Sequence, residues 1–176
     1  MPWDKSRPFS PHKKDKTMIT VGDKLPTVSL REVKESGVED VTTDNFFKGK
    51  KVALFAVPGA FTSTCSVKHL PSFVKNADAL KEKGIDQVVC TAVNDAAVLR
   101  AWGEQGNAGG KVTMLADGNG DFARALGLEV DLTKSGMGKR SRRYSMIVDN
   151  GVVKALNVEE PGAYGVSSGD HMLTQV

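Results

Sequence analysis

Cys65 is the residue of this chain whose type and setting best suit a chemical reaction. It ends the segment PGAFTSTC, residues 58–65, after an apolar run and before a helix-like one. A thiol reacts as its thiolate, and an ordinary cysteine, with a pKa of about 8.5, is only slightly ionised at neutral pH. The free N–H groups and positive dipole end of a helix N-terminus favour the anion. The position of Cys65 therefore predicts an activated thiol; the alternative is a small buried apolar side chain.

Two residues shortly before Cys65 favour the reactive interpretation. Thr62 lies one helical turn earlier, with a hydroxyl that can donate or accept a hydrogen bond, and Pro58 can wall the thiol off from solvent. In the segment TSTC a threonine stands where a dithiol oxidoreductase carries the first cysteine of C-x-x-C. A disulfide within one turn is therefore impossible, which disfavours a dithiol oxidoreductase.

The second cysteine and the nearest histidine allow two interpretations each. Cys90 stands in the apolar run VVCTAV and is expected to be a core thiol; the alternative is a resolving cysteine for Cys65. Such a disulfide needs Cα atoms within about 7 Å, so local unfolding would have to come first. His69 follows Cys65 by four residues, and a structural position near the pocket is favoured over a catalytic base. His12, His69 and His171 lack metal-binding spacing, so no metal site is expected.

The elements that must position Cys65 alternate between strands and helices. Continuous apolar runs over 50–58, 85–93 and 111–117 predict strands buried on both faces. Helical spacing and capping residues predict helices over 66–84, 94–105, 120–128 and 167–176. A hairpin is expected over 142–158, with its turn at Asp149-Asn150-Gly151. The order indicates an α/β fold of thioredoxin-like type, a central mixed sheet with helices on both faces and Cys65 at a strand's C-terminal end.

The helix predicted after Cys65 carries two further signals. Gly84 is expected to stop it, and Pro71 is expected to kink or break it. Its apolar residues recur at helical spacing, at Val67, Leu70, Phe73, Val74, Ala77 and Leu80.

Composition limits the class of protein. The chain has 176 residues, 40% hydrophobic and 26% charged, and no apolar run of membrane-spanning length. Residues 1–17 hold five of the 24 basic and two of the 21 acidic residues, so the rest is balanced and nucleic-acid binding is disfavoured. This segment is expected to be a disordered tail before a single domain over residues 18–176. Two cysteines indicate a reducing compartment; a cytoplasmic protein is expected, with mitochondria or another organelle left open.

Several blocks of the sequence, in one order, resemble a known family. Pro58-x-x-x-Thr62-x-x-Cys65 is similar to the P-x-x-x-T-x-x-C motif of the peroxiredoxins. The blocks VPGAFTSTCSVKHLPSF, VNDAAVLRAWG, MLAD and RRYSMIVDNGVVKALNVE resemble the type II, peroxiredoxin-5-like branch. The resemblance covers residues 18–176. One departure is Ser63, where the family's motif has proline; it is expected to alter the stiffness of the loop more than the chemistry.

The resemblance implies a thiol peroxidase that reduces hydrogen peroxide and alkyl hydroperoxides without metal or organic cofactor. Cys65 would attack the O–O bond and become a sulfenic acid, Thr62 would hydrogen-bond the peroxide, and Pro58 would shield the sulfur. The family's arginine falls on Arg143, which would stabilise the thiolate and polarise the O–O bond. The other basic residues of KRSRR, Lys139, Arg140 and Arg142, are expected in a solvated loop; steering of an anionic reductant is the alternative.

Reductant and partners also follow from the resemblance. Some relatives carry a resolving cysteine in the last segment, but residues 163–176 contain none. A one-cysteine cycle reduced by glutaredoxin and glutathione is favoured over one reduced by thioredoxin, and a homodimer is expected. The alternative function is a thiol-based redox sensor or relay that passes oxidation to a partner protein.

Overall fold

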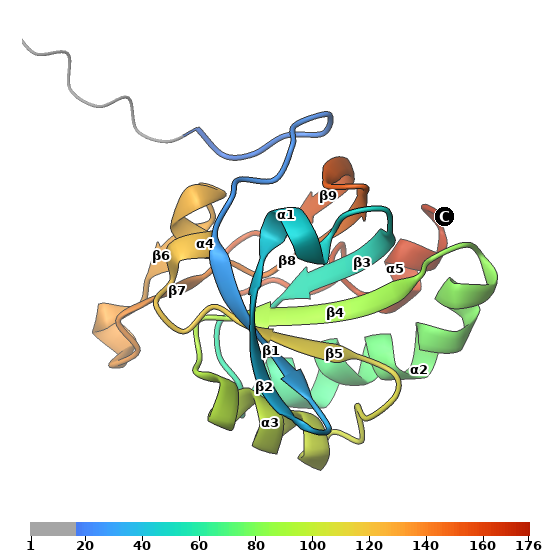
Figure 1. Cartoon of the computed structure of the whole chain (residues 1–176). Helices are drawn as coiled ribbons and strands as arrows, with labels where there is room; N and C mark the ends of the chain where they lie inside the picture. The colour runs from blue at the N-terminus through green and yellow to red at the C-terminus, as the bar shows by residue number, and fades with distance from the viewer. Residues whose placement is uncertain (1–16) are drawn as a thin grey trace, which may run out of the picture.

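The computed structural model describes residues 17–176 of the chain (Figure 1). The strands are β1 (Ser29–Lys34), β2 (Gly37–Thr42), β3 (Lys51–Ala56), β4 (Gln87–Ala92), β5 (Thr113–Ala116), β6 (Glu129–Asp131), β7 (Lys139–Ser141), β8 (Tyr144–Asp149) and β9 (Val152–Val158). The α-helices are α1 (Thr43–Phe46), α2 (Leu70–Glu82), α3 (Ala96–Gln105), α4 (Asp121–Ala125) and α5 (Gly169–Leu173). A π-helical turn, η1 (Cys65–His69), precedes α2, and a 3-10 turn, η2 (Thr133–Ser135), precedes β7.

A seven-stranded mixed sheet, in the order β2-β1-β5-β4-β3-β8-β9, separates two layers of helices. Strands β3, β4 and β5 run parallel, whereas β1, β2, β8 and β9 pair antiparallel with their neighbours. One apolar cluster joins the sheet to α2, α3 and α5, and a second joins the other face to α1 and α4. The predicted α/β fold with helices on both faces is confirmed. No helix of residues 17–176 is long and apolar enough to cross a membrane.

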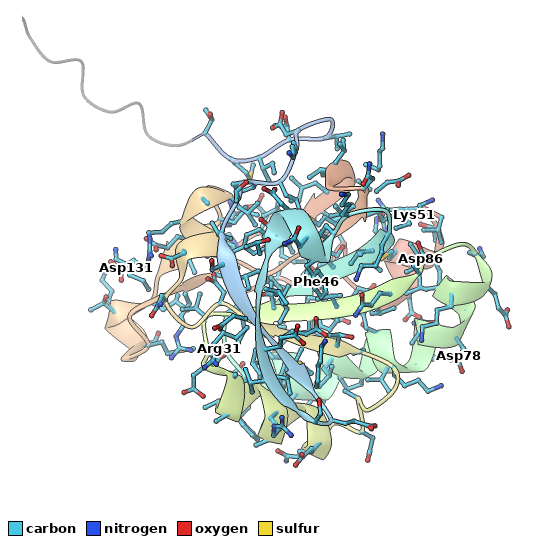
Figure 2. All side chains as sticks on the ribbon, viewed as in Figure 1. Arg31, Phe46, Lys51, Asp78, Asp86 and Asp131 are labelled. Carbon is cyan, nitrogen blue, oxygen red and sulfur yellow. The ribbon has the colours of Figure 1, made fainter. Side chains whose placement is uncertain are left out.

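Strand β3 shows why a continuous apolar run predicted the centre of the sheet. Ala53 and Phe55 pack into the cluster under α2, while Val52, Leu54 and Ala56 pack into the opposite one. In Figure 2, Lys51 and Asp86 mark the N-terminal ends of β3 and β4, where Lys51 N donates to Asp86 Oδ2 at 2.8 Å. Asp131, on the β6–β7 ribbon, lies at the opposite end, toward which the parallel strands run.

Two hairpins flank the parallel strands, and only one was predicted. The β8–β9 turn has Asn150 at φ 48° and Gly151 at φ 80°, the left-handed pair of a type I′ turn. Asn150 Oδ1 also accepts from Gly49 N at 2.7 Å. The β1–β2 hairpin was missed, because β2 is largely exposed on both faces and lacks an apolar pattern.

The helix after β3 differs from a regular α-helix at its start. Helical residues begin at 63, and the Leu70 N–H donates to the Cys65 carbonyl, five residues back, within η1. Pro71 is the second residue of α2, and its missing N–H and its ring would disturb a regular helix that continued from residue 63. The kink predicted at Pro71 thus takes the form of a π turn just before it. Val67, one of the apolar residues at the predicted helical spacing, is nevertheless 72% exposed.

The C-terminal helix α5 packs closely on the start of α2. Ser168 caps α5 by accepting from His171 N at 3.0 Å, as predicted for a short capped helix. Gly169 N donates to Ser72 Oγ at 3.0 Å. A Cβ on Gly169 would lie 2.5 Å from the Ser72 carbonyl oxygen, so only glycine allows this approach.

The predicted disordered tail over residues 1–17 lies almost wholly outside the described residues. It stays a prediction, as does the domain expected to follow from residue 18.

The substitution Gly169→Ala is expected to destabilise the fold by about 2 kcal/mol, because the added methyl group meets backbone that cannot move aside. For a chain of this length the melting temperature would fall by roughly 4–8 °C. Thermal unfolding followed by circular dichroism checks this. Gly165→Ala is the matched control, since an added Cβ there meets nothing within 4 Å. Equal melting temperatures for the two variants would contradict the close packing of α5.

Candidate active site

Cys65 lies where β3 passes into the helix, as the sequence predicted. It is the first residue of η1, and its exposed fraction is 0%. Its side chain belongs to the apolar cluster beneath α2, together with Phe55 and Phe73. The next residue, Ser66, accepts a hydrogen bond from Trp102 Nε1 of α3 at 3.0 Å. The thiol is thus held in a packed turn at the C-terminal end of a central strand.

Arg143 reaches Cys65 from the neighbouring strand. Strand β8 pairs antiparallel with β3, and Tyr144 lies opposite Ala56. Arg143, just before β8, therefore arrives beside the turn that follows β3, and its Nη2 donates to Cys65 Sγ at 3.1 Å. A guanidinium at this distance stabilises negative charge on sulfur. The structure thus brings together the two residues that were predicted from sequence segments 78 positions apart.

His69 is tied into the same site and is fully buried. Its Nε2 lies 2.9 Å from the Ser167 carbonyl oxygen, which can only accept, so Nε2 carries the proton. Its Nδ1 lies 2.9 Å from Arg143 Nη1, which can only donate, so Nδ1 is unprotonated. Burial, and secondly the charge of Arg143, lower the pKa of His69 to about 3. The ring is neutral and supports Arg143, in line with the structural position favoured from the sequence.

Glu159 and Ser167 were missed by the sequence analysis. Glu159 follows β9, is 5% exposed, and accepts from Ser167 Oγ at 2.7 Å. A carboxylate at a strand end, before the Gly- and Ser-containing loop GAYGVSS, was the only sequence signal. It could not show that this loop supplies the carbonyl bound to His69.

Thr62 and Pro58 lie on the loop between β3 and the helix. Thr62 Oγ1 donates its proton to the Gly59 carbonyl at 2.7 Å, so the hydroxyl oxygen can act towards a ligand as a hydrogen-bond acceptor. Pro58 and Arg143 line a cavity of about 240 Å³. The remaining cavity wall includes apolar residues of two further segments: Val130, Leu132, Pro161 and Ala163.

The same loop carries backbone strain. Phe61 has φ 64°, a left-handed conformation that is unfavourable for an aromatic residue, and it is 51% exposed. Ala60 N donates to Asn94 Oδ1 at 2.9 Å, which ties the loop to the end of β4. Strain of this kind persists where surrounding contacts enforce it, and it is commonest at functional sites.

The expectation that Lys139, Arg140 and Arg142 form a solvated loop is wrong for the two arginines. Arg140 is partly buried and donates to the carbonyl of Val93 at 3.0 Å, and Arg142 donates to the carbonyl of Glu159 at 3.1 Å. Lys139 is exposed and pairs with Asp131. A charge run shows its sign but not the backbone acceptors that the fold brings to it.

Cys90 lies in β4 and is completely buried in the same cluster as Cys65. Neither cysteine forms a disulfide. Burial, and secondly the proximity of Cys65, raise the pKa of the Cys90 thiol well above its usual value. This is the environment expected of a core thiol. Over residues 17–176, no three side chains of His, Cys, Asp or Glu gather as metal ligands would.

Acid is expected to destabilise the fold through His69. The unfolded ring has a pKa near 6.5 and the folded ring one of about 3, so the unfolded chain binds the proton first. The free energy of unfolding should therefore fall as the pH drops from about 6.5, with a slope of up to about 1.4 kcal/mol per pH unit. Urea unfolding between pH 7 and pH 4 should show a smaller loss in His69→Gln than in the parent. His171→Gln serves as the control, and an unchanged slope in His69→Gln would contradict the neutral buried ring.

Comparison with known proteins gives a consistent family. A family profile described as Redoxin matches residues 20–173. The curated protein Peroxiredoxin-2E, chloroplastic, from Arabidopsis thaliana is 50% identical over 159 residues, which cover 88% of this chain and 68% of the relative.

Solved structures extend the likeness to three dimensions. Reduced Prx3 from Vibrio vulnificus, in complex with hydrogen peroxide, is 49% identical, with a TM-score of 0.86 and coverage of 90% of this chain and 99% of that one. Peroxiredoxin 5 from Alvinella pompejana is 36% identical, with a TM-score of 0.78 and coverage of 89% and 96%. The chain therefore has the thioredoxin-like fold and belongs to the peroxiredoxins, the thiol-dependent peroxidases, within their type II, peroxiredoxin-5-like branch.

Proposed function

We propose that Cys65 is the nucleophile of this peroxidase and that its substrates are hydrogen peroxide and alkyl hydroperoxides. The Cys65 thiolate attacks one peroxide oxygen, the O–O bond breaks, and the leaving oxygen takes up a proton to become water or an alcohol. The sulfur is oxidised to a sulfenic acid. The observation that carries the proposal is the donation from Arg143 Nη2 to Cys65 Sγ at 3.1 Å.

The groups around the sulfur suit this displacement. Negative charge moves from sulfur to the leaving oxygen, and Arg143 keeps its positive charge throughout, so it can stabilise both ends of the reaction. Thr62 already donates to Gly59, so its hydroxyl is suited to accept from the O–H of the peroxide. Pro58 borders the cavity beside Arg143 and limits the access of water.

The cavity supports alkyl hydroperoxides as substrates alongside hydrogen peroxide. Beyond Pro58 and Arg143 its walls are formed in part by Val130 and Leu132 from the β6 region and by Pro161 and Ala163 from the loop after β9. An alkyl group on the distal oxygen could rest against these apolar side chains, which favour such contact by removing apolar surface from water.

We favour glutaredoxin and glutathione over thioredoxin as the reductant. A thiol condenses with the sulfenic acid to give a mixed disulfide and water, and a second thiol then releases Cys65. Cys90 is a buried core thiol with a raised pKa, so it is poorly suited to attack as a thiolate. Cys65 is itself 0% exposed, so a bulky reductant requires the turn η1 to open first.

A redox sensor or relay would use the same cysteine without sustained turnover, and repeated peroxide consumption distinguishes the two. The homodimer stays a prediction; exposed Phe61, Val67 and Val166, in the segments around the site, are suited to cover by a second copy. The cytoplasmic location also stays a prediction, and the Arabidopsis relative is named as chloroplastic.

The substitution Cys65→Ser is expected to abolish peroxide consumption, since a hydroxyl is not ionised near neutral pH and cannot form a sulfenic acid. Loss of hydrogen peroxide and of cumene hydroperoxide would be followed with glutaredoxin, glutathione and its recycling system. Circular dichroism would check that the variant is folded. A folded Cys65→Ser protein that keeps most of its turnover would overturn the proposal.

The variant Cys90→Ser is expected to turn over like the parent with glutaredoxin and glutathione, because Cys65 works alone. Turnover would be measured with glutaredoxin, glutathione and thioredoxin in separate assays, and non-reducing mass spectrometry would look for an internal disulfide after peroxide. A stalled Cys90→Ser variant, together with a Cys65–Cys90 disulfide in the parent, would instead identify Cys90 as the resolving cysteine.

A further inference from the structure

The carboxylate of Glu159 is surrounded by donors from one short loop. One oxygen accepts from Gly165 N at 2.6 Å, Ser167 N at 3.2 Å and Ser167 Oγ at 2.7 Å, and the other accepts from Val166 N at 3.2 Å. Burial raises the pKa of this carboxyl, but the hydrogen bonds together outweigh burial and hold it below its usual range. Residues 165–167 are therefore folded around an ionised carboxylate.

The backbone of Glu159 is tied to the arginine of the site. Glu159 N donates to the Arg143 carbonyl at 3.0 Å, one step beyond the last β8–β9 pair. The Glu159 carbonyl accepts from Arg142 Nη2 at 3.1 Å. Glu159 thus fixes the main chain from which the Arg143 side chain starts.

The loop that Glu159 organises also fixes the far end of the Arg143 side chain. The Ser167 carbonyl holds the proton of His69 on Nε2, which leaves Nδ1 as the acceptor for Arg143 Nη1. If this carbonyl moved away, the ring could carry its proton on Nδ1 and would then present a donor to the guanidinium. Arg143 would be displaced from Cys65, because one of its two fixed contacts would become repulsive.

We infer that Glu159 is a positioning residue for the reactive thiolate: through the Ser167 carbonyl and His69 it keeps Arg143 aimed at Cys65. The inference rests on the proposed role of Cys65. Glu159 lies 94 positions from Cys65 in the sequence and does not contact its sulfur, yet it influences how readily Cys65 ionises.

The sign of the effect separates this role from that of a simple charge. Among residues 17–176, no Lys or Arg forms an ion pair with the Glu159 carboxylate. If Glu159 acted only as a negative charge near the site, its removal would make the Cys65 thiolate easier to form. If it positions Arg143, its removal makes the thiolate harder to form.

The experiment measures the rate of Cys65 alkylation by iodoacetamide from pH 4 to pH 9, by mass spectrometry, in a Cys90→Ser background. In Glu159→Gln an amide NH₂ faces the loop N–H donors, so the loop no longer holds Arg143 at Cys65. The midpoint of the pH profile should therefore rise by about one pH unit, which is a tenfold loss of thiolate at a pH below the midpoint. Glu160→Gln is the matched control: it removes the same charge from the next, exposed residue, and its midpoint should not rise.

A midpoint in Glu159→Gln that is unchanged or lower would overturn the inference. Should that variant fail to fold, Ser167→Ala removes one of the four donors while keeping the carbonyl that binds His69. Its midpoint should rise by a smaller amount, and an unchanged midpoint there would equally overturn the inference. Alkylation needs no peroxide turnover, so such a result leaves the proposed nucleophile standing if Cys65→Ser has lost its activity.

Discussion

A guanidinium keeps its charge at any physiological pH and can only donate hydrogen bonds. An arginine beside a buried sulfur therefore needs buried hydrogen-bond acceptors that are themselves unprotonated. Arg143 meets this demand with Cys65 Sγ on one nitrogen and His69 Nδ1 on the other. The second acceptor works only as one tautomer of a neutral ring, which the Ser167 carbonyl selects. Burial of the histidine, the shape of the loop after β9 and the ionised state of Glu159 all follow from the same requirement.

The sheet supplies the geometry that this arrangement needs. Antiparallel pairing of β3 and β8 places the end of one strand beside the beginning of the other, so a helix leaving β3 and an arginine entering β8 meet at one edge. Parallel β4 ends at the same edge, where Asn94 holds the loop through Ala60. Residues from three separate chain segments therefore meet at this edge.

Much of this could be predicted from the sequence, because it depends on local patterns. A buried strand before a helix, a cysteine at the junction and an Asn-Gly turn each show within a few residues. The parts that were missed depend on distant hydrogen bonds: nothing near Glu159 indicates that its carboxylate folds a loop onto His69, 90 positions earlier. Val67 was misplaced for a different reason, since counting apolar residues assumes one helical period throughout, and η1 interrupts that period.

The interruption has a geometric effect on the thiol itself. Each residue of a regular α-helix turns the chain by about 100°, so the additional residue taken up in the π turn rotates everything before it by that amount relative to α2. This rotation aligns Cys65 with Phe73 and Leu80 on the side of the helix that faces the sheet, and all three are 0% exposed. In an unbroken α-helix the sulfur would point along the flank of the helix, away from the strand edge where Arg143 arrives. The extra residue of the π turn thus rotates the Cys65 thiol towards Arg143.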